Sequence, residues 1–288
     1  MTLVARVAIA LLVLLAAPIG AQSRIRTGFR ATADVSLRIW VPTGLVRVVT
    51  WDRDSIGVEG VTGRNGKFFG GSSGSAAKLG IDARDAKDVT LPGGDLTVSV
   101  PRRARVWIKM TAGHVDADGV AGELDAFVVG GSVAVRNTSG VVSVESIDAP
   151  VTIDRASGSL RIRGGRGSVT LRDVAGTATI ATVSGAVELS GARIPDARVE
   201  TIGGFITVDA RTLGRGALDL QTHAGDITVI VNGAHLPSLD LVSRGGKVVN
   251  PFAKSPASAP GIIARSFKGT INVRAGSGVE GGKPARSP

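Results

Sequence analysis

The sequence predicts an all-β protein: a parallel β-solenoid, similar to a β-helix, made of flattened two-strand coils with an irregular β cap at its N-terminal end. Three observations support this prediction. Small or turn-forming residues recur at intervals of nine, the residues two and four positions after each of them are nearly all apolar, and longer intervals occur only at every second turn.

The nine-residue spacing defines the strands. Every interval between turn residues from Ala104 to Gly185 is nine, and most of the turn residues are glycine, as tight turns favour. Apolar and polar residues alternate within each unit, as in Ser168–Arg172, so one face of each strand enters a core. The turn residues are Gly94, Ala104, Gly113, Gly122, Gly131, Gly140, Ala149, Gly158, Gly167, Gly176, Gly185, Pro195, Gly204, Gly216, Gly225, Pro237 and Gly246.

The longer intervals indicate how the strands are connected. After Gly185 the intervals are 10, 9, 12, 9, 12 and 9. In a coil with two strands and two turns, alternate turns lie along the same edge, so insertions lengthen one edge only. Each coil then has about 18–21 residues. The alternative, an antiparallel β-sandwich, also has short alternating strands, but its turns rarely keep a constant interval. We therefore assign residues 92–274 to the solenoid repeat.

Residues 1–21 have the pattern of a cleavable signal peptide. One basic residue, Arg6, precedes an apolar run over residues 7–17 and a short segment of small residues. The alternative is an uncleaved membrane anchor, but the run is shorter than a bilayer-spanning helix needs. The chain has no cysteine and therefore no disulfide. We expect an exported protein, in the periplasm, at the cell surface or outside the cell, with no transmembrane helix in the mature chain.

The segments that flank the repeat are less regular. Residues 22–91 contain three candidate strands, 35–39, 45–49 and 55–58, and are expected to cap the first coil, because an open end would recruit another chain. Trp40 and Trp51 are expected to close that end. Residues 70–75 have the composition of a flexible loop, and residues 275–288 form a tail rich in Gly, Ser and Pro.

Several segments resemble a known family. They are residues 44–52, residues 96–101, and Ser-Gly-x-Val-x-Val units such as Ser139–Val144 and Ser184–Leu189. In their order they are similar to the bacterial putative adhesin family, an exported domain of unknown function, over residues 37–273. The resemblance implies a β-solenoid at the cell envelope and brings no catalytic residues.

The charge of the chain suggests one binding surface. The formal net charge is +10, and the lengthened edge is rich in Arg and Lys with few acids. A basic rim on an exported solenoid would attract phosphate or carboxylate groups of an anionic envelope polysaccharide or lipid, and a surface protein is another possible partner. Solubilising charge is the equally plausible alternative. The residues of this rim are Arg193, Arg211, Arg215, Lys254, Arg265 and Lys268.

Outward acids raise the alternative of an enzyme. The position five after alternate turns reads Asp118, Arg136, Asp154 and Arg172, so opposite charges would pair between neighbouring strands. Asp118 and Asp154, with Asp116, could instead act as the acids of a polysaccharide lyase or glycosidase, which needs carboxylates a few ångströms apart. The intervening arginines favour structural pairing.

No cofactor or metal site is indicated. His114, His223 and His235 fall in different units, and no cysteine is present to bind zinc. A row of threonines, Thr152 and Thr170 with later members, is interpreted as a ladder on a solvated sheet. Nucleic acid is not an expected partner, because aromatic residues make up only 3% of the chain. The sequence thus predicts a noncatalytic envelope scaffold or adhesin-like binding module.

Overall fold

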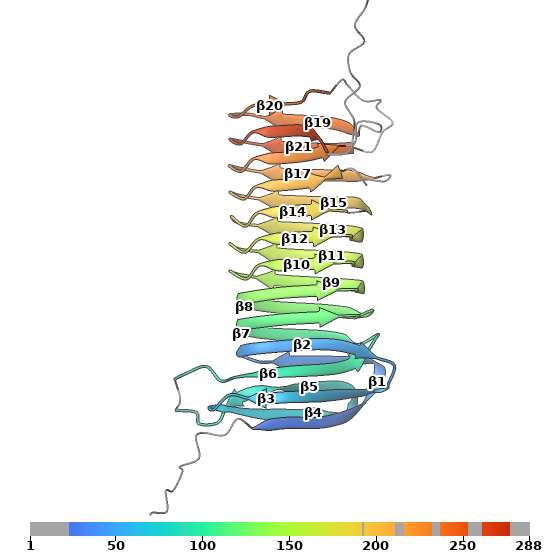
Figure 1. Ribbon diagram of the computed structural model, residues 1–288, viewed down its shortest axis with the longest axis vertical. Helices are drawn as coiled ribbons and strands as arrows, with labels where there is room; N and C mark the ends of the chain where they lie inside the picture. The colour runs from blue at the N-terminus through green and yellow to red at the C-terminus, as the bar shows by residue number, and fades with distance from the viewer. Residues whose placement is uncertain are drawn as a thin grey trace, which may run out of the picture.

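The fold was obtained as a computed structural model that describes residues 23–87, 89–191, 193–210, 216–231, 237–252 and 261–276, with the backbone alone for residues 193–195. The predicted signal peptide and residues 277–288 lie outside this part of the chain. The described residues form 22 β-strands in one mixed sheet and contain no α-helix (Figure 1). The all-β prediction is therefore confirmed. No helix in these residues has the length and apolarity of a membrane span.

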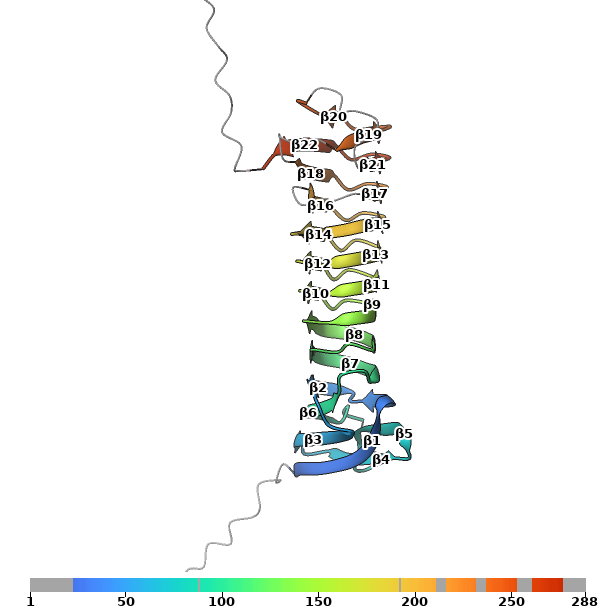
Figure 2. The same cartoon turned by 90° about the vertical axis from the view of Figure 1, so that its right-hand side faces the viewer.

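The strands lie above one another in two columns along one long axis (Figures 1 and 2). The long strands β7 and β8 bend from the first column into the second. The first column contains, in spatial order, β5 (Gly74–Ala83), the second half of β1 (Arg24–Trp40), the first halves of β7 (Arg105–Asp118) and β8 (Glu123–Arg136), β9 (Ser139–Ser146), β11 (Ser157–Gly164), β13 (Ala175–Thr182), β15 (Arg193–Thr201), β17 (Ala217–Thr222), β21 (Gly261–Ser266) and β19 (Ser238–Ser243).

The second column follows the same axis. It contains β6 (Gly93–Pro101), β2 (Thr43–Trp51), the second halves of β7 and β8, β10 (Val151–Asp154), β12 (Val169–Arg172), β14 (Val187–Ser190), β16 (Ile206–Asp209), β18 (Ile227–Val231), β22 (Ile271–Ala275) and β20 (Val248–Val249). A strand of the first column and the next strand of the second column are called a level below.

Neighbouring levels pair in parallel with a constant offset. Val151 of β10 faces Val169 of β12, which faces Val187 of β14. In the regular part of the repeat this offset is two turn intervals, so residues in the same phase stand directly above one another. The inward side chains are buried at each of these positions, and each contributes roughly 1.5–3 kcal/mol when fully buried. The predicted alternation of inward and outward residues therefore places a continuous apolar core between the columns.

The corners where column two returns to column one have a fixed backbone geometry. Asn137, Arg155 and Asp173, which follow one another at the 18-residue offset, have positive φ values of 52°, 51° and 49°. Shortly after each of them a glycine stacks on the glycine of the neighbouring level. A Cβ atom added to Gly158 would lie 2.1 Å from the carbonyl oxygen of Gly140, so these corners require glycine.

The order of levels at both ends differs from the order along the chain. β21 pairs with both β17 and β19, so the level β21–β22 lies between β17–β18 and β19–β20. At the other end, the level formed by β1 and β2 lies between β5–β6 and β7. The order of levels therefore differs from the order of the Gly94, Pro237 and Gly246 units along the chain.

Antiparallel strands lie at the N-terminal end. The first half of β1 pairs with β3 (Ser55–Thr62), β3 pairs with β6, and β4 (Gly66–Ser72) pairs with β5, all antiparallel. The expected strands 35–39, 45–49 and 55–58 lie within β1, β2 and β3. Trp51 packs against Gly57 of β3, but Trp40 points outward from the first column with 53% of its surface exposed. Trp40 therefore does not close the end.

Residues 70–75 are not an extended loop. Gly70–Ser72 belong to β4 and Gly74–Ser75 to β5, with Ser73 between them. Ser73 donates its backbone N–H to the carbonyl of Ala76 at 2.8 Å, and the Ser72 hydroxyl donates to the carbonyl of Arg30 at 2.8 Å. Pairing with a neighbouring strand overrides the loop-like composition.

Candidate functional site

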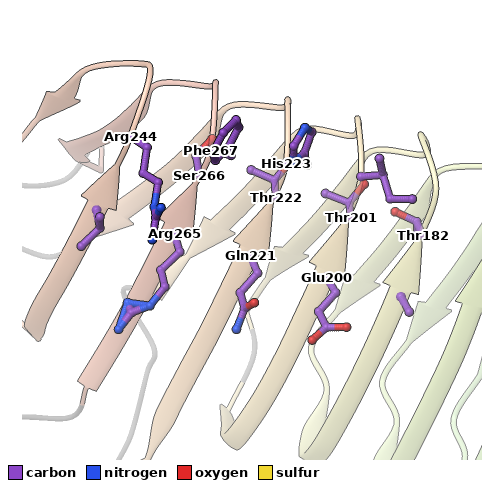
Figure 3. Close-up of a pocket in the computed structure, with 13 residues that line it drawn as sticks. Thr182, Glu200, Thr201, Gln221, Thr222, His223, Arg244, Arg265, Ser266 and Phe267 are labelled. Carbon is purple, nitrogen blue, oxygen red and sulfur yellow. The ribbon is translucent and has the colours of Figure 1, made fainter.

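A shallow hollow of about 670 Å³ lies along one edge of the C-terminal half of the molecule. It is formed where strands β13, β15, β17, β21 and β19 end and the chain turns into the second column. Three rows of side chains form it (Figure 3): a buried hydroxyl row, an exposed row in the turns, and a polar row on the outward face of the strands.

The hydroxyl row fixes the turns. Thr201, Thr222 and Ser266 occupy equivalent, paired positions at the ends of their strands and are buried. The hydroxyl of Thr222 accepts a hydrogen bond from the N–H of Gly225 at 3.0 Å and donates to the carbonyl of Gly204 in the neighbouring level at 3.4 Å. Ser266 repeats both contacts with Gly269 and Gly225. These hydroxyls are structural groups, because their hydrogen bonds are used in the fold.

The next residue in each turn points outward and forms an apolar row. Ile202 is 59% exposed, and the rings of His223 and Phe267 are stacked with centroids 4.9 Å apart and an interplanar angle of 8°. Figure 3 shows His223 and Phe267 side by side along the edge. In each turn this residue directly follows the buried hydroxyl residue. Because successive side chains point to opposite sides, the side chain after a buried hydroxyl points into solvent.

The polar row contains charges that are mostly paired. Glu200, Gln221 and Arg265 are direct neighbours across β15, β17 and β21. Arg198 donates from Nε to Glu200 at 2.6 Å, and this hydrogen bond and charge raise the pKa of Arg198. Arg265 forms an ion pair with Asp240 at 2.9 Å. The hollow thus offers stacked rings and a mixed polar floor, which suit contact with a partner surface.

The structure places only part of the predicted basic rim. Arg265 lies in β21 and borders the hollow, whereas Lys268 lies in the turn between β21 and β22, on the edge opposite to the lengthened one. The placement of Lys268 on the lengthened edge is therefore wrong. Arg193 begins β15, and nothing is described of its side chain; Arg211, Arg215 and Lys254 lie outside the described residues.

Two basic residues that sequence reasoning missed lie beside Lys268. Arg244 and Lys247 are exposed in and after the turn that follows β19, and the N–H of Gly245 donates to the carbonyl of Phe267 at 2.7 Å. We call Arg244, Lys247, Arg265 and Lys268 the C-terminal basic cluster. The sequence segment Ser243-Arg-Gly-Gly-Lys contained the charge, and the parallel pairing of β19 with β21 brings it next to Lys268.

The outward acids are held by neighbouring groups. Asp116 forms ion pairs with Arg47 at 3.2 Å and with Arg136, and Asp154 forms an ion pair with Arg155. Opposite charges thus pair between levels as expected, although the partners differ from the expected ones. Asp118 instead accepts a hydrogen bond from Asn137 at 2.8 Å.

The threonine row has the expected register. Thr152 faces Thr170 across β10 and β12, and Ala134 and Glu188 flank them.

The histidines that the structure describes do not come together. His114 contacts the hydroxyl of Ser132 at 2.8 Å and lies far along the axis from His223, while His235 is outside the described residues. Within the described part of the chain, no group of three or more His, Cys, Asp or Glu residues is placed to hold a metal ion.

Comparisons with known proteins show a likeness of fold. No protein-family model and no curated protein matches the sequence. A putative adhesin from Parabacteroides merdae is 10% identical with a TM-score of 0.50, and the alignment covers 90% of this chain and 98% of that one. A putative adhesin from Bacteroides fragilis is 13% identical with a TM-score of 0.46, covering 89% and 98%.

A putative cell adhesion protein from Clostridium sporogenes is 9% identical with a TM-score of 0.32, and the alignment covers 89% of this chain and all of that chain. At these identities the similarity concerns the fold alone. The resemblance to putative adhesins that the sequence motifs carry is confirmed at that level.

Proposed function

We propose that the chain is a β-solenoid of two-strand coils that serves as a noncatalytic, exported binding module at the cell envelope. The parallel pairing between levels supports the solenoid: one strand of each column and the two turns between them make one coil of 18 residues in the regular part. Stacked coils present the same kind of side chain along a row, which gives an elongated contact surface.

The partner proposed for this module carries anionic groups, as envelope polysaccharides and lipids do. The observation that supports it is the C-terminal basic cluster, in which four cations share one end of the molecule and, among the described residues, only Arg265 is ion-paired, to Asp240. Clustered cations raise the local concentration of an anionic partner, and salt screens this attraction.

Binding to envelope fractions tests the proposal. Purified residues 22–288 are incubated with cell-wall and outer-membrane fractions over a series of salt concentrations, and the retained protein is measured. We expect retention at low salt that decreases as salt is raised. The double variant Arg244→Glu and Lys268→Glu should be retained about three- to tenfold less, because reversal of two charges lowers the net charge of the cluster by four units.

The matched control reverses charge at the opposite end of the molecule, at the exposed residues Lys67 and Lys78, and should retain normal binding. Equal losses in the two variants, or retention that salt does not change, would overturn the proposal. Separate incubations with anionic lipid vesicles and with isolated envelope polysaccharide distinguish the two sources of negative charge.

The alternative function is that of a carbohydrate-active enzyme. The contacts of Asp116 and Asp154 with arginines disfavour it, because both carboxylates are engaged with guanidinium groups of the protein instead of facing a substrate position. Incubation of the purified protein with uronate-containing and neutral glycans, followed by analysis for new reducing ends, distinguishes the two functions. Turnover would favour the enzyme.

A further inference from the structure

A second surface patch lies on the outward face of the first column near the N-terminal end. Trp40 of β1 is 53% exposed, Trp107 of β7 is 39% exposed, and Phe127 of β8 is half-buried. Trp40 faces Lys109, and Lys109 faces Phe127, so the aromatic rings are carried by three adjacent strands. The sequence did not predict this grouping, because Trp40 and Trp107 are far apart along the chain.

Lys109 lies between two of these rings. Its ammonium nitrogen is 5.7 Å from the ring centroid of Trp40 and 5.9 Å from that of Phe127, within the range of cation–π attraction. On the other side of Trp40, Phe69 of β4 covers Gly80, the direct strand neighbour of Trp40. The indole of Trp40 therefore has the Lys109 ammonium group within cation–π range, and 53% of the surface of the residue is exposed.

Trp107 forms part of a separate hollow of about 440 Å³. Its direct strand neighbours are Arg38 on one side and Asp125 on the other, and Arg105 faces Glu123 in the next outward position. All four charged residues line the hollow together with the indole. The hollow thus combines one aromatic surface with two guanidinium groups and two carboxylates.

The ion pairs on the described part of the surface include none from this hollow, as four acids elsewhere illustrate by contrast. Among the described residues, no ion pair involves Arg38, Arg105, Glu123 or Asp125, whereas Asp116, Asp148, Asp154 and Glu200 are each joined to an arginine. A charged side chain that forms no ion pair keeps its hydrogen-bonding capacity for a ligand. This holds here even though opposite charges lie on the neighbouring strands.

From this arrangement we infer a binding site for an acidic polysaccharide, that is, for pyranose units that carry carboxylates. A pyranose ring has an apolar face of C–H groups that packs on an indole, as on Trp107, and Trp40 on the adjacent strand offers a second packing position. The hydroxyl groups of the sugar donate to Glu123 and Asp125, and its carboxylate accepts from Arg38 or Arg105.

A nucleic acid fits the patch less well. Bases stack on aromatic side chains, and the grouping of Trp40, Trp107 and Phe127 supplies more aromatic surface than the sequence indicated. Both ligands are polyanions, so repulsion by Glu123 and Asp125 does not separate them. The two carboxylates are acceptors for the ring hydroxyls of a pyranose unit, donors that a DNA backbone lacks, and this favours the polysaccharide.

This site gives the proposed binding module a ligand class, and to that extent the inference rests on the proposed function. The residues of the site are distinct from the C-terminal basic cluster. The test uses purified residues 22–288, with polygalacturonate as the probe, a neutral galactan for comparison and a single-stranded oligonucleotide as the competing class. Binding is followed by tryptophan fluorescence and by retardation in affinity electrophoresis.

We expect polygalacturonate to change the tryptophan emission and to retard the protein, and the neutral galactan to do so more weakly. Trp107→Ala should reduce the affinity about tenfold or more, as removal of a central aromatic contact does. Arg105→Gln should reduce the preference for the acidic over the neutral polymer. Phe205→Ala, which removes an exposed aromatic ring far from the patch, should bind normally.

Circular dichroism establishes that each variant is folded. Trp107→Phe is a second variant, which keeps an aromatic ring at this position and should bind polygalacturonate partially. The inference is overturned if polygalacturonate does not bind, if Trp107→Ala binds as the parent does, or if the oligonucleotide binds more tightly. If retention on envelope fractions persists in Trp107→Ala while polygalacturonate fails to bind, the proposed function stands and this site does not. If polygalacturonate binds but the protein is not retained on envelope fractions, this site stands and the proposed function does not.

Discussion

At the scale of single residues, most positions of the repeat serve either the core or a corner. Gly140 and Gly158 are stacked so closely that neither accepts a side chain, and Val120 and Val174 fill the inner side of the same corners. Thr138 occupies the equivalent inner position between them, and its hydroxyl is buried without a hydrogen-bond partner. This residue departs from the rule that buried polar groups are satisfied.

The variant Thr138→Val is expected to stabilise the protein. Valine has nearly the same shape as threonine and is already present at the equivalent positions 120 and 174, so it removes an unsatisfied hydroxyl without a clash. We expect the free energy of unfolding to rise by about 1 kcal/mol. Urea denaturation measures the change. Thr170→Val on the outward face serves as the control and should have little effect; a destabilised Thr138→Val would mean that the hydroxyl has a partner.

At the scale of elements, the turn from the first column to the second is a repeated hydrogen-bonded unit. A hydroxyl residue ends the strand, an outward residue and one further residue follow, and glycine completes the turn, as in Thr222–Gly225. The hydroxyl joins its own turn to the neighbouring level through the carbonyl of Gly204. The local sequence contains this unit, and the nine-residue spacing located its glycine but not the role of the hydroxyl.

Replacement of Thr222 tests the unit. Thr222→Val leaves the buried N–H of Gly225 without its side-chain acceptor, so we expect a loss of about 1–3 kcal/mol in the free energy of unfolding. Thr222→Ser keeps the hydroxyl and should lose less, because serine occupies the equivalent position 266 with the same two contacts. Thermal and urea denaturation of the pair make the comparison. A valine variant as stable as the serine variant would contradict the role assigned to the hydroxyl.

At the scale of the whole molecule, the spatial order of the levels at the two ends differs from their order along the chain. β21 has a strand on each side, whereas β19, which precedes it in the chain, pairs on one side only within the described residues. The inward residues of β19 are correspondingly less buried than those of β21. The last described level in the chain, β21–β22, is therefore internal, and the level before it in the chain, β19–β20, forms the end of the stack of described strands.

Hydrogen exchange measures this order directly. Amides of a strand enclosed between two others open less often than those of a terminal strand. We expect the amides of residues 262–265 in β21 to exchange more slowly than those of residues 239–242 in β19, by about tenfold or more. A linear order of levels predicts the opposite ranking, so faster exchange in β21 would contradict the interleaved arrangement.

The sequence by itself determined the local features of this protein. The nine-residue spacing located the strands and corners, and the alternation of residues separated inward from outward side chains, because both depend on short-range geometry: the period of a strand and the conformational freedom of glycine. These features do not require knowledge of which level lies next to which.

The tertiary structure alone decided the order of levels, and with it both surface sites. Each level has the same inward pattern, so the sequence is compatible with several neighbours for the segments at the ends, and a longer connection adds little closure entropy. Pairing Thr222 with Ser266 rather than with Ser243 brings Phe267 beside His223, and pairing Trp40 with Lys109 brings the two exposed tryptophans together. Side chains far apart in the sequence meet because their strands pair, and a repeated pattern does not specify that choice.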